Sequence, residues 1–313
     1  MRVLVTGANG FVGRHVVAEL RAAGFDVRAA LRPGADLPVP GMEAVRIADI
    51  GPDTDWDQAL TGVDAVVHLA GRAHVLRESV QDPRREFLRV NAEGTRRLAE
   101  ACVGRVERFL FLSSIAVHGS AAGPRIDRDS PTRPDTPYGE SKLRAEQALR
   151  EHDQEGRLTV TILRPPAVYG PGAPGNLARL AGAVRRGVPL PLASVRNRRS
   201  LVGVSSLARA LSACLERPEA SRGSFPVADE ESLSTAEIIR CLARGTGRPA
   251  RLWPCPPGLL RLGGRLSGRS RMIAQLVDSL EVDARDLRAA IGPFQQHGSC
   301  EGLAELAAQV GAE

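Results

Sequence analysis

Tyr138 and Lys142 lie four residues apart, directly after Pro137. Proline suits the first position of a helix, and residues four apart lie on one helical face, so the phenol and the ammonium are expected to be neighbours. A free phenol has a pKa of about 10, and a neighbouring cation favours its ionised form. The pair therefore predicts a proton donor and acceptor that interconverts an alcohol and a ketone. Chance is a poor explanation, because the chain contains two tyrosines and a single lysine.

A serine hydroxyl is the expected third member of this site. Ser113 and Ser114 follow the apolar run 108–112, which is typical of a strand. In a parallel sheet, the loops at the carboxyl ends of the strands line the ligand crevice. A serine pair at a strand end is by itself more typical of a turn or a helix cap. Beside Tyr138 and Lys142 it predicts a hydroxyl that binds the substrate oxygen, and Ser114 is the preferred candidate.

Three glycines separate the first predicted strand from the first predicted helix. Glycine at this spacing permits a tight turn, lets bare backbone approach a pyrophosphate and lets the helix pack close to the strand. The free N–H groups at the helix start then face the phosphates. The segment predicts a dinucleotide site made by Gly7, Asn9, Gly10, Phe11, Val12 and Gly13.

The first half of the chain alternates between strand and helix patterns. Short apolar runs predict strands at 2–6, 26–31, 44–47, 64–69, 108–112 and 158–163. Helical patterns lie between them at 11–23, 56–60, 83–103 and 138–151. Strands that are apolar on both faces and separated by helices indicate a parallel sheet covered on both sides. The predicted fold class is therefore α/β, a Rossmann-like doubly wound parallel sheet.

The texture changes after residue 168, where a stretch rich in glycine and proline begins. Helices are predicted at 176–186, 205–217, 234–244, 257–266 and 300–310, and only 224–227 reads as a clean further strand. We therefore expect residues 1–168 to form the dinucleotide-binding domain, to which residues 200–228 return. Residues 169–199 and 229–313 are expected to form a smaller, mostly helical C-terminal lobe that binds the substrate.

Composition argues against several classes of partner. The 313 residues are 43% hydrophobic and 25% charged, as in an ordinary soluble globular chain. No apolar run is long enough to span a bilayer and the N-terminus does not resemble a signal peptide, so we expect a cytoplasmic protein with no membrane partner. The net charge of +6 comes from scattered arginines, and eleven aromatic residues offer few stacking platforms for bases. No nucleic-acid partner is expected.

Five widely spaced cysteines, without a Cys-x-x-Cys pair, argue against a disulfide framework, a redox pair and a zinc site. The six histidines also lack the spacing of metal ligands, so no metal is expected.

With these motifs, the sequence resembles the extended short-chain dehydrogenase/reductases, and among them the nucleotide-sugar epimerase/dehydratase group. Further stretches that carry the resemblance lie at 66–71, 90–95, 163–166, 168–172 and 199–202. The subgroup it resembles most contains UDP-N-acetylquinovosamine-type 4-keto reductases and UDP-hexose 4-epimerases. Two departures stand out: His118 replaces a tyrosine of the family pattern, and the segment beginning at Gly203 replaces a His-Val-x-Asp motif. The end of the family pattern is also reduced, to Gly292-Pro293-Phe294.

The resemblance implies a role for each matching residue. Ser114, Tyr138 and Lys142 would form the catalytic triad. Asn176 and Arg199 would hold the nucleotide diphosphate of the substrate. Ser114 would bind the reacting oxygen of the sugar. Contacts to the cofactor are implied for Asp49, Ile50, Leu69, Ala70, Gly71, Asn91, Tyr138, Lys142 and Pro165.

Leu31 stands where an NAD-type site places an acid at the end of the second strand, and Arg32 follows it. A guanidinium suits a ribose 2′-phosphate, so NADP(H) is favoured as cofactor. Asp36 lies close enough in sequence to leave NAD(H) open.

The expected activity is reduction of the C4 ketone of a UDP-4-keto-6-deoxy-N-acetylhexosamine by the nicotinamide cofactor. One alternative is a UDP-hexose or UDP-N-acetylhexosamine 4-epimerase with tightly bound NAD, and a second is a non-catalytic NADP-binding sensor or scaffold. Dehydration is not expected, because Ile115 and Ala116 replace the Asp-Glu pair that 4,6-dehydratases use. The expected partner is a UDP-sugar, and a homodimer is one expected assembly.

Overall fold

A parallel sheet of seven strands forms the centre of the protein, in a computed structural model that describes residues 1–73, 81–295 and 297–310. Its strand order is β10-β7-β5-β4-β1-β2-β3, and every neighbouring pair is parallel. The strands are β1 (Arg2–Thr6), β2 (Asp26–Leu31), β3 (Glu43–Arg46), β4 (Ala65–His68), β5 (Arg108–Leu112), β7 (Thr159–Arg164) and β10 (Gly223–Pro226). The order reverses between β1 and β4, which is where such sheets bind nucleotides. The predicted fold class is confirmed.

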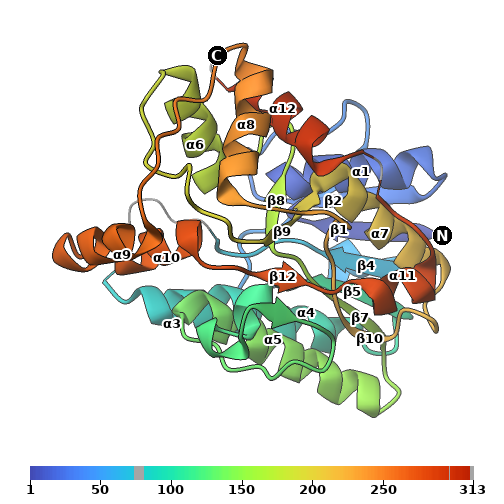
Figure 1. Cartoon of the computed structure of the whole chain (residues 1–313). Coiled ribbons are helices and arrows are strands. Elements are labelled where there is room, and N and C mark those ends of the chain that lie inside the picture. The colour runs from blue at the N-terminus through green and yellow to red at the C-terminus, as the bar shows by residue number, and fades with distance from the viewer. Residues whose placement is uncertain (74–80, 296, 311–313) are drawn as a thin grey trace.

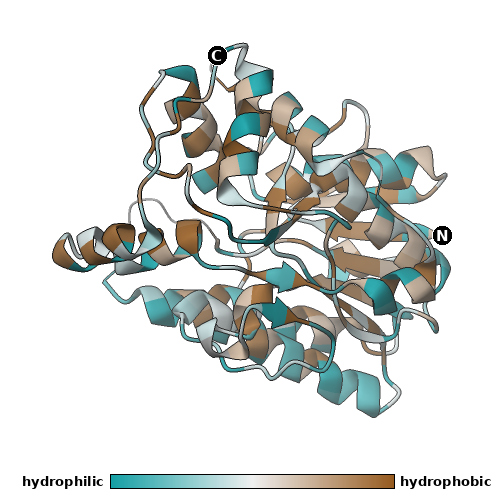
Figure 2. Ribbon diagram, in the orientation of Figure 1, coloured by the Kyte–Doolittle hydropathy of each residue, from teal (hydrophilic) through white to brown (hydrophobic). Residues whose placement is uncertain are grey.

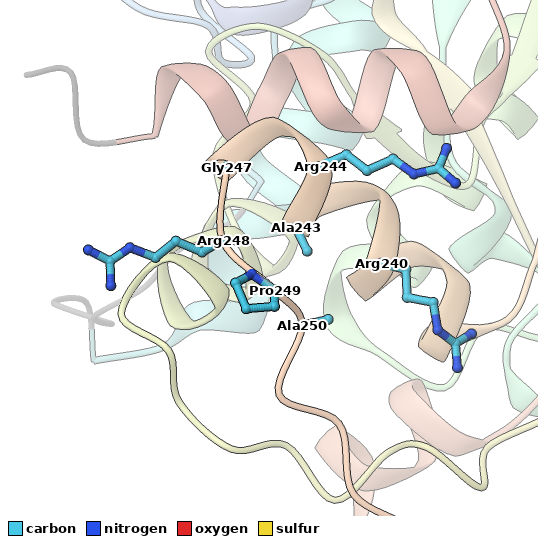
Figure 3. A pocket seen from close by; sticks show the side chains of 7 residues that line it. All are labelled: Arg240, Ala243, Arg244, Gly247, Arg248, Pro249 and Ala250. Carbon is cyan, nitrogen blue, oxygen red and sulfur yellow. The ribbon is translucent and has the colours of Figure 1, made fainter.

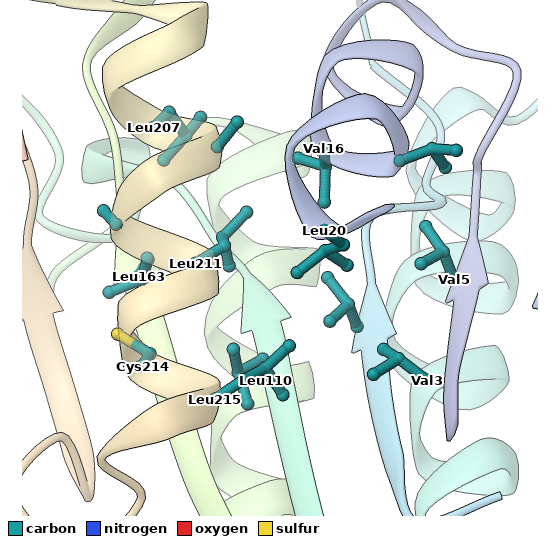
Figure 4. Packing of buried hydrophobic residues seen from close by; sticks show 14 of the residues in the cluster. Val3, Val5, Val16, Leu20, Leu110, Leu163, Leu207, Leu211, Cys214 and Leu215 are labelled. Carbon is teal, nitrogen blue, oxygen red and sulfur yellow. The ribbon is translucent and has the colours of Figure 1, made fainter. Parts of the chain in front are cut away.

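Helices cover both faces of this sheet (Figure 1). On one face lie α1 (Phe11–Ala22), α7 (Val204–Glu216) and α11 (Arg285–Ile291), whose apolar side chains form a cluster with Val3 and Val5. Figure 4 shows Leu207 and Leu211 of α7 beside the sheet and Val16 and Leu20 of α1 next to them. On the other face lie α2 (Asp57–Leu60), α4 (Gly94–Cys102) and α5 (Pro137–Gln154). Burial on both faces explains why these strands read as continuous apolar runs.

The helix predicted over 83–103 is present as a continuous helical segment, but it is not uniformly α-helical. The chain forms α3 (Pro83–Phe87), then a π-helical turn (Leu88–Glu93), then α4. π-helical turns are rare and often occur at functional sites, because they redirect one side chain within a helix. Here the redirected turn contains the buried Asn91.

The prediction of only one further strand after residue 168 is also wrong. β8 (Ala167–Tyr169), β9 (Arg199–Gly203) and β11 (Ser232–Leu233) form a second, three-stranded sheet. β12 (Glu281–Val282) pairs with β6 (Arg125–Ile126). These strands are two to five residues long, too short for a period of two to register in the sequence.

The remaining helices gather around this second sheet and at its side. They are α6 (Asn176–Arg185), α8 (Thr235–Thr246), α9 (Pro257–Leu266), α10 (Ser270–Val277) and α12 (Ser299–Gln309). α6, α8 and α12 share an apolar cluster with Tyr169 and Leu201, whereas α9 and α10 project to the left in Figure 1.

A disulfide joins Cys241 of α8 to Cys300 of α12, although the spacing of the cysteines argued against a disulfide framework. The two helices approach closely because Gly245 has no side chain: a Cβ at this position would collide with the carbonyl of Ala304. The Cα atoms of the two cysteines are 5.0 Å apart, within the range that a disulfide spans. The cysteines are 59 positions apart and gave no spacing signal in the sequence.

Candidate active site

The turn between β1 and α1 is shaped for close backbone approach. Gly7 has a φ of +68°, and a Cβ there would lie 2.8 Å from the backbone nitrogen of Ala70. A Cβ on Gly13 would collide with the carbonyl of Gly7. Gly10 immediately precedes the first residue of α1 and makes no side-chain cap, so the first N–H groups of the helix remain available to an anion. The residues present therefore fit the pyrophosphate of a dinucleotide.

The carboxyl end of β2 carries positive rather than negative charge. Leu31 is buried, and the exposed Arg32 follows it. The guanidinium of Arg46 donates to the carbonyl of Arg32 across 3.0 Å. Asp36 is exposed, and Asp49 forms a 3.0 Å ion pair with Arg89. Two arginines thus lie at the strand end where a site that binds the ribose 2′-hydroxyl of NAD has a carboxylate.

A chain of buried hydroxyls with one histidine connects β1, β4 and α4. The hydroxyl of Thr95 donates to the carbonyl of Asn91 at 2.6 Å, so it accepts from Nε2–H of His68 at 3.0 Å. Nδ1 of His68 is then an acceptor for the hydroxyl of Thr6 at 2.7 Å, and Thr6 accepts from the N–H of Ala70 at 3.2 Å. Burial, with the nearby Lys142 ammonium, lowers the pKa of His68 to about 3, so the ring stays neutral.

Asn91 fixes the relative positions of the β4 loop and α5. Its Nδ2 donates to the carbonyl of Arg72 and to the hydroxyl of Ser141, both at 3.0 Å. Its Oδ1 accepts from the N–H of Arg72 at 2.7 Å. A Cβ on Gly71 would lie 2.9 Å from that oxygen. Sequence reasoning predicted Asn91 but missed Ser141.

The structure brings the three predicted catalytic residues together. Thr136 caps α5 by accepting from the N–H of Gly139 at 2.9 Å, which fixes the helix start beside Tyr138. Tyr138 forms a side-chain hydrogen bond with Ser114. One turn further along α5, Nζ of the buried Lys142 donates to the carbonyl of Leu112 at 2.9 Å.

Two further loops lie next to the three catalytic residues. A Cβ on Gly71 would lie 3.3 Å from Nζ of Lys142, so the loop predicted to contact the cofactor passes directly beside the ammonium. Pro165 is buried behind the serine loop, where its carbonyl accepts from the N–H of Ile115 at 3.1 Å.

One electrostatic expectation for the pair is not met. The sequence predicted that Lys142 lowers the pKa of Tyr138, but burial raises the pKa of this phenol, and the hydrogen bond with Ser114 opposes the rise. Burial also lowers the pKa of Lys142 to about 8, opposed by the carboxylate of Glu146. In this site the cost of removing charge from water exceeds the benefit of the i+4 spacing.

A buried ion pair that the sequence analysis missed lies behind the triad. The fully buried carboxylate of Glu146 accepts from Nε and Nη2 of Arg164 at 2.9 and 2.6 Å and from the hydroxyl of Ser113 at 2.6 Å. Arg150 adds a further bond at 2.7 Å. His118 lies 3.3 Å from Nη1 of Arg164, in the position where the family pattern has tyrosine. The signal was available, because Glu146 follows Lys142 by four residues and so lies on the same face of α5.

The predicted substrate residues lie on elements that border α10. Asn176, the first residue of α6, has its amide nitrogen 3.4 Å from Oε1 of Gln275. Arg199, at the start of β9, donates to the carbonyl of Asp278 at 3.0 Å, and burial lowers its pKa. A cavity of about 590 Å³ lies beside Arg196 and Asn197, between the 194–197 loop, α9 and the 120–124 loop.

Asp229 binds the segment at Gly203, where the chain departs from the family pattern. The carboxylate of Asp229 accepts from the hydroxyl of Tyr169 at 2.6 Å and from the N–H of Gly203 at 3.1 Å. Burial raises the pKa of Asp229. The junction between β8, β9 and the residues after β10 is therefore held by a tyrosine–aspartate bond.

Other features of the described residues give no second reaction site. No group of three or more His, Cys, Asp or Glu side chains in this part of the chain could hold a metal. A shallow hollow of about 330 Å³ at the end of α8 is lined by Arg240, Arg244 and Arg248 and contains none of the predicted residues (Figure 3).

The NAD-dependent epimerase/dehydratase family model matches residues 3–228, the region that contains the glycine turn and the triad. The chain belongs to this family. It is an enzyme of the extended short-chain dehydrogenase/reductase type.

Similar proteins extend the match beyond residue 228. A UDP-glucose 4-epimerase of Vibrio cholerae is 34% identical over 295 residues, which cover 93% of this chain and 89% of that protein. The solved UDP-glucose 4-epimerase of Thermus thermophilus, a complex with NAD, has a TM-score of 0.76 at 29% identity, and each chain is covered completely. MoeE5, solved with UDP-glucuronic acid and NAD, has a TM-score of 0.78 at 30% identity over 98% of both chains.

Proposed function

We propose that this enzyme is a UDP-sugar 4-epimerase that retains its nicotinamide cofactor between turnovers. The observation that carries the reaction class is the assembled triad: Tyr138 is hydrogen-bonded to Ser114 and is followed one turn later by the buried Lys142. The extent of the match to UDP-glucose 4-epimerases supports the epimerase over the 4-keto reductase that the sequence favoured.

The residues divide the chemistry at C4 of the sugar among them. Tyr138 would accept the proton of the C4 hydroxyl and later return it, while Ser114 would hold the same oxygen by a hydrogen bond. Lys142 would orient the ribose hydroxyls of the bound cofactor. Acceptance and return of the C4 hydride is the chemistry that a bound nicotinamide cofactor supplies. Asn91 would position this group through its bonds to Arg72 and Ser141.

The choice of cofactor depends on the end of β2. Leu31, Arg32 and Arg46 leave no carboxylate at this strand end and favour a 2′-phosphate, whereas similar solved structures hold NAD. Dissociation constants for NADPH and NADH, measured by titration of protein freed of its bound cofactor, compare the two directly. NADPH should bind more tightly, and Arg32→Ala should remove that difference. Tighter binding of NADH to the unaltered protein would reverse the assignment.

The substrate is proposed to bind in the lobe formed by residues 169–199 and 229–313. Arg199 and Asn176 would contact its diphosphate from the starts of β9 and α6. Thermal unfolding in the presence of UDP tests this: UDP should raise the midpoint for the unaltered protein and not for Arg199→Ala.

A second candidate, reduction of a UDP-4-keto-6-deoxy-N-acetylhexosamine, is favoured by the positively charged β2 end, because a reductase must exchange its oxidised cofactor at each turnover. The two candidates differ in what the purified protein contains. An epimerase should release a stoichiometric amount of nicotinamide cofactor on denaturation and invert C4 of a UDP-hexose without added cofactor. Consumption of NADPH matching the 4-keto sugar reduced would favour the reductase instead.

Tyr138→Phe tests the catalytic assignment for either candidate. It should lower kcat by about 10³-fold or more while the variant still binds cofactor, because only the proton-transfer group is lost. Tyr169→Phe is the matched control, since it removes the other tyrosine hydroxyl of the chain at a structural position. It should lower the unfolding temperature and retain activity. Substantial turnover by Tyr138→Phe would refute the role given to this residue.

A further inference from the structure

Residues 238–277 contain eight arginines and no aspartate or glutamate. Since the whole chain has a net charge of +6, all other residues together carry −2. The arginines are indeed scattered through the sequence, but the acids that would balance them are missing from this segment. In Figure 3, the side chain of Arg248 extends to the opposite side from those of Arg240 and Arg244. All eight arginines are exposed, namely Arg240, Arg244, Arg248, Arg251, Arg261, Arg265, Arg269 and Arg271.

Most of this charge is not neutralised by the protein itself. Within the described part of the chain, only Arg261 and Arg271 of the eight form ion pairs, with Asp278 at 2.7 Å and Asp135 at 4.0 Å. The arginine side chains of these two pairs are 50% and 64% exposed, so solvent weakens the attraction to the carboxylates. The segment therefore presents free positive charge to its surroundings.

The same segment exposes a line of leucines on α9. Leu259, Leu262 and Leu266 expose 59%, 50% and 82% of their surface, and spacings of three and seven residues place them on one helical face. Another face of α9 packs on α10, where a Cβ on Gly264 would lie 2.8 Å from Ile273. Figure 2 shows the apolar colouring of this projecting helix. The leucines thus face outward although α9 already has a packing partner.

Trp253, which precedes α9 in the sequence, and Met272 of α10 are exposed as well, at 49% and 47%. We refer to Trp253, Leu259, Leu262, Leu266 and Met272 as the apolar stripe. Tryptophan and leucine flanked by arginine are typical of helices that lie in the headgroup region of a bilayer.

The apolar stripe adjoins the elements that border the active site. Arg271 donates to the carbonyl of Asp135 at 3.2 Å, three residues before Tyr138. On the same helix, Gln275 lies next to Asn176. A surface that bound α9 and α10 would therefore lie beside the entrance to the proposed substrate lobe.

We propose that the apolar stripe and its arginines dock this enzyme on the surface of an anionic lipid bilayer. Arginines attract the headgroups and the leucines enter the boundary of the acyl chains. A second copy of the chain fits less well, because a two-fold contact through this face would oppose arginines to arginines with no acid in the segment. The sequence predicted no membrane partner because no segment could span a bilayer. The described residues indeed contain no helix long and apolar enough to cross one. A helix that lies on the surface needs no such length.

The first test is co-sedimentation of the full-length protein with vesicles of phosphatidylcholine alone or mixed with phosphatidylglycerol. Binding should require phosphatidylglycerol and should weaken as salt is raised, because the attraction is partly electrostatic. Absence of binding to the mixed vesicles at low salt would overturn the proposal.

Variants separate the stripe from the net charge. Replacing Leu259, Leu262 and Leu266 together by glutamine should weaken vesicle binding about tenfold or more, whereas Leu37→Gln, at another exposed leucine, should leave it unchanged. Arg265→Gln with Arg269→Gln should also weaken binding more than Arg21→Gln with Arg157→Gln, which removes the same charge elsewhere. Circular dichroism checks that each variant is folded. Equal binding by the triple leucine variant and the unaltered protein would refute the stripe.

The two tryptophans provide an independent readout. Trp56 is fully buried, so a shift of the emission to shorter wavelength on adding mixed vesicles should come from Trp253. Trp253→Phe should abolish the shift while the protein still sediments with the vesicles. If the shift instead depends on protein concentration without lipid, and sedimentation velocity shows self-association that the triple leucine variant loses, the face binds a second copy and the proposal fails.

Discussion

Two regions of this enzyme treat arginine in opposite ways. Behind the triad, Arg164 is 3% exposed. Its guanidinium donates to the carboxylate of Glu146 and lies next to the ring of His118. Along residues 238–277, arginines are exposed and most of them lack a carboxylate partner in the described structure. A buried charge is tolerable only with every partner in place, so the first region is rigidly specified. The second region keeps its charges available for something outside the chain.

What anchors each region differs accordingly. The loop that follows β5 is held by the hydrogen bond from the hydroxyl of Ser113 to the buried carboxylate of Glu146. The arginine-rich segment is held by the disulfide at Cys241 and by an apolar cluster that includes Ile239, Leu252 and Ile273. Breaking these anchors one at a time tests the contrast.

Glu146→Gln should give the largest effect, because it leaves the Arg164 guanidinium buried without its counter-charge. We expect the free energy of unfolding to fall by about 3–5 kcal/mol. Urea denaturation measures the change, and Arg164→Met added to Glu146→Gln should recover part of it. A loss below about 1 kcal/mol would mean that the pair is dispensable.

Cys300→Ser should come next. Opening the loop between Cys241 and Cys300, which are 59 positions apart, should lower the free energy of unfolding by about 2–4 kcal/mol. Cys255→Ser is the control, since Cys255 is a free cysteine in the same segment, and it should leave the unfolding temperature unchanged. An equally stable Cys300→Ser protein would show that the bond is not formed in solution.

Lys142 predicts a pH dependence of stability. Burial lowers its pKa to about 8 from the usual 10.5, so the folded protein loses this proton before the unfolded chain does. Between these two values the unfolded state binds more protons, and stability should rise with pH, by at most about 1.4 kcal/mol per unit. Lys142→Met should flatten this rise, and no other lysine in the chain can contribute to it. An identical slope in the variant would exclude Lys142 as the cause.

Asp278→Asn should have the smallest effect, because the Arg261–Asp278 pair is about half exposed on both sides. We expect a change in unfolding free energy of less than about 1 kcal/mol. Urea denaturation alongside Glu146→Gln compares an exposed and a buried ion pair in one protein. Comparable losses for the two variants would contradict the contrast between the regions.

The sequence was most informative where apolar residues form a clear pattern or where reactive residues have a helical spacing. The central strands were located to within a residue or two, because each buried strand is a continuous apolar run. Tyr138 and Lys142 were located by helical spacing. The π-helical turn at Asn91 could not be predicted, because the sequence pattern across it reads as one continuous helix.

Contacts between distant segments could not be read from the sequence. The disulfide depends on Gly245 letting two helices approach, and the buried ion pair joins α5 to β7. The electrostatics of Tyr138 were misjudged because burial cannot be measured from spacing. The exposed leucines of α9 were hidden as well, since an apolar helical pattern does not reveal whether its face is covered.

The pairing of β6 with β12 has a consequence for the modularity of the enzyme. β6 lies in the loop that connects Ser114 to Tyr138, and its partner strand is formed by Glu281 and Val282, far along the chain. A fragment ending at residue 228 would contain every proposed catalytic residue and still lack the strand that braces their connecting loop. The C-terminal part therefore cannot be exchanged between relatives as a separate specificity cassette. Any chimera that replaces it also replaces one wall of the catalytic loop.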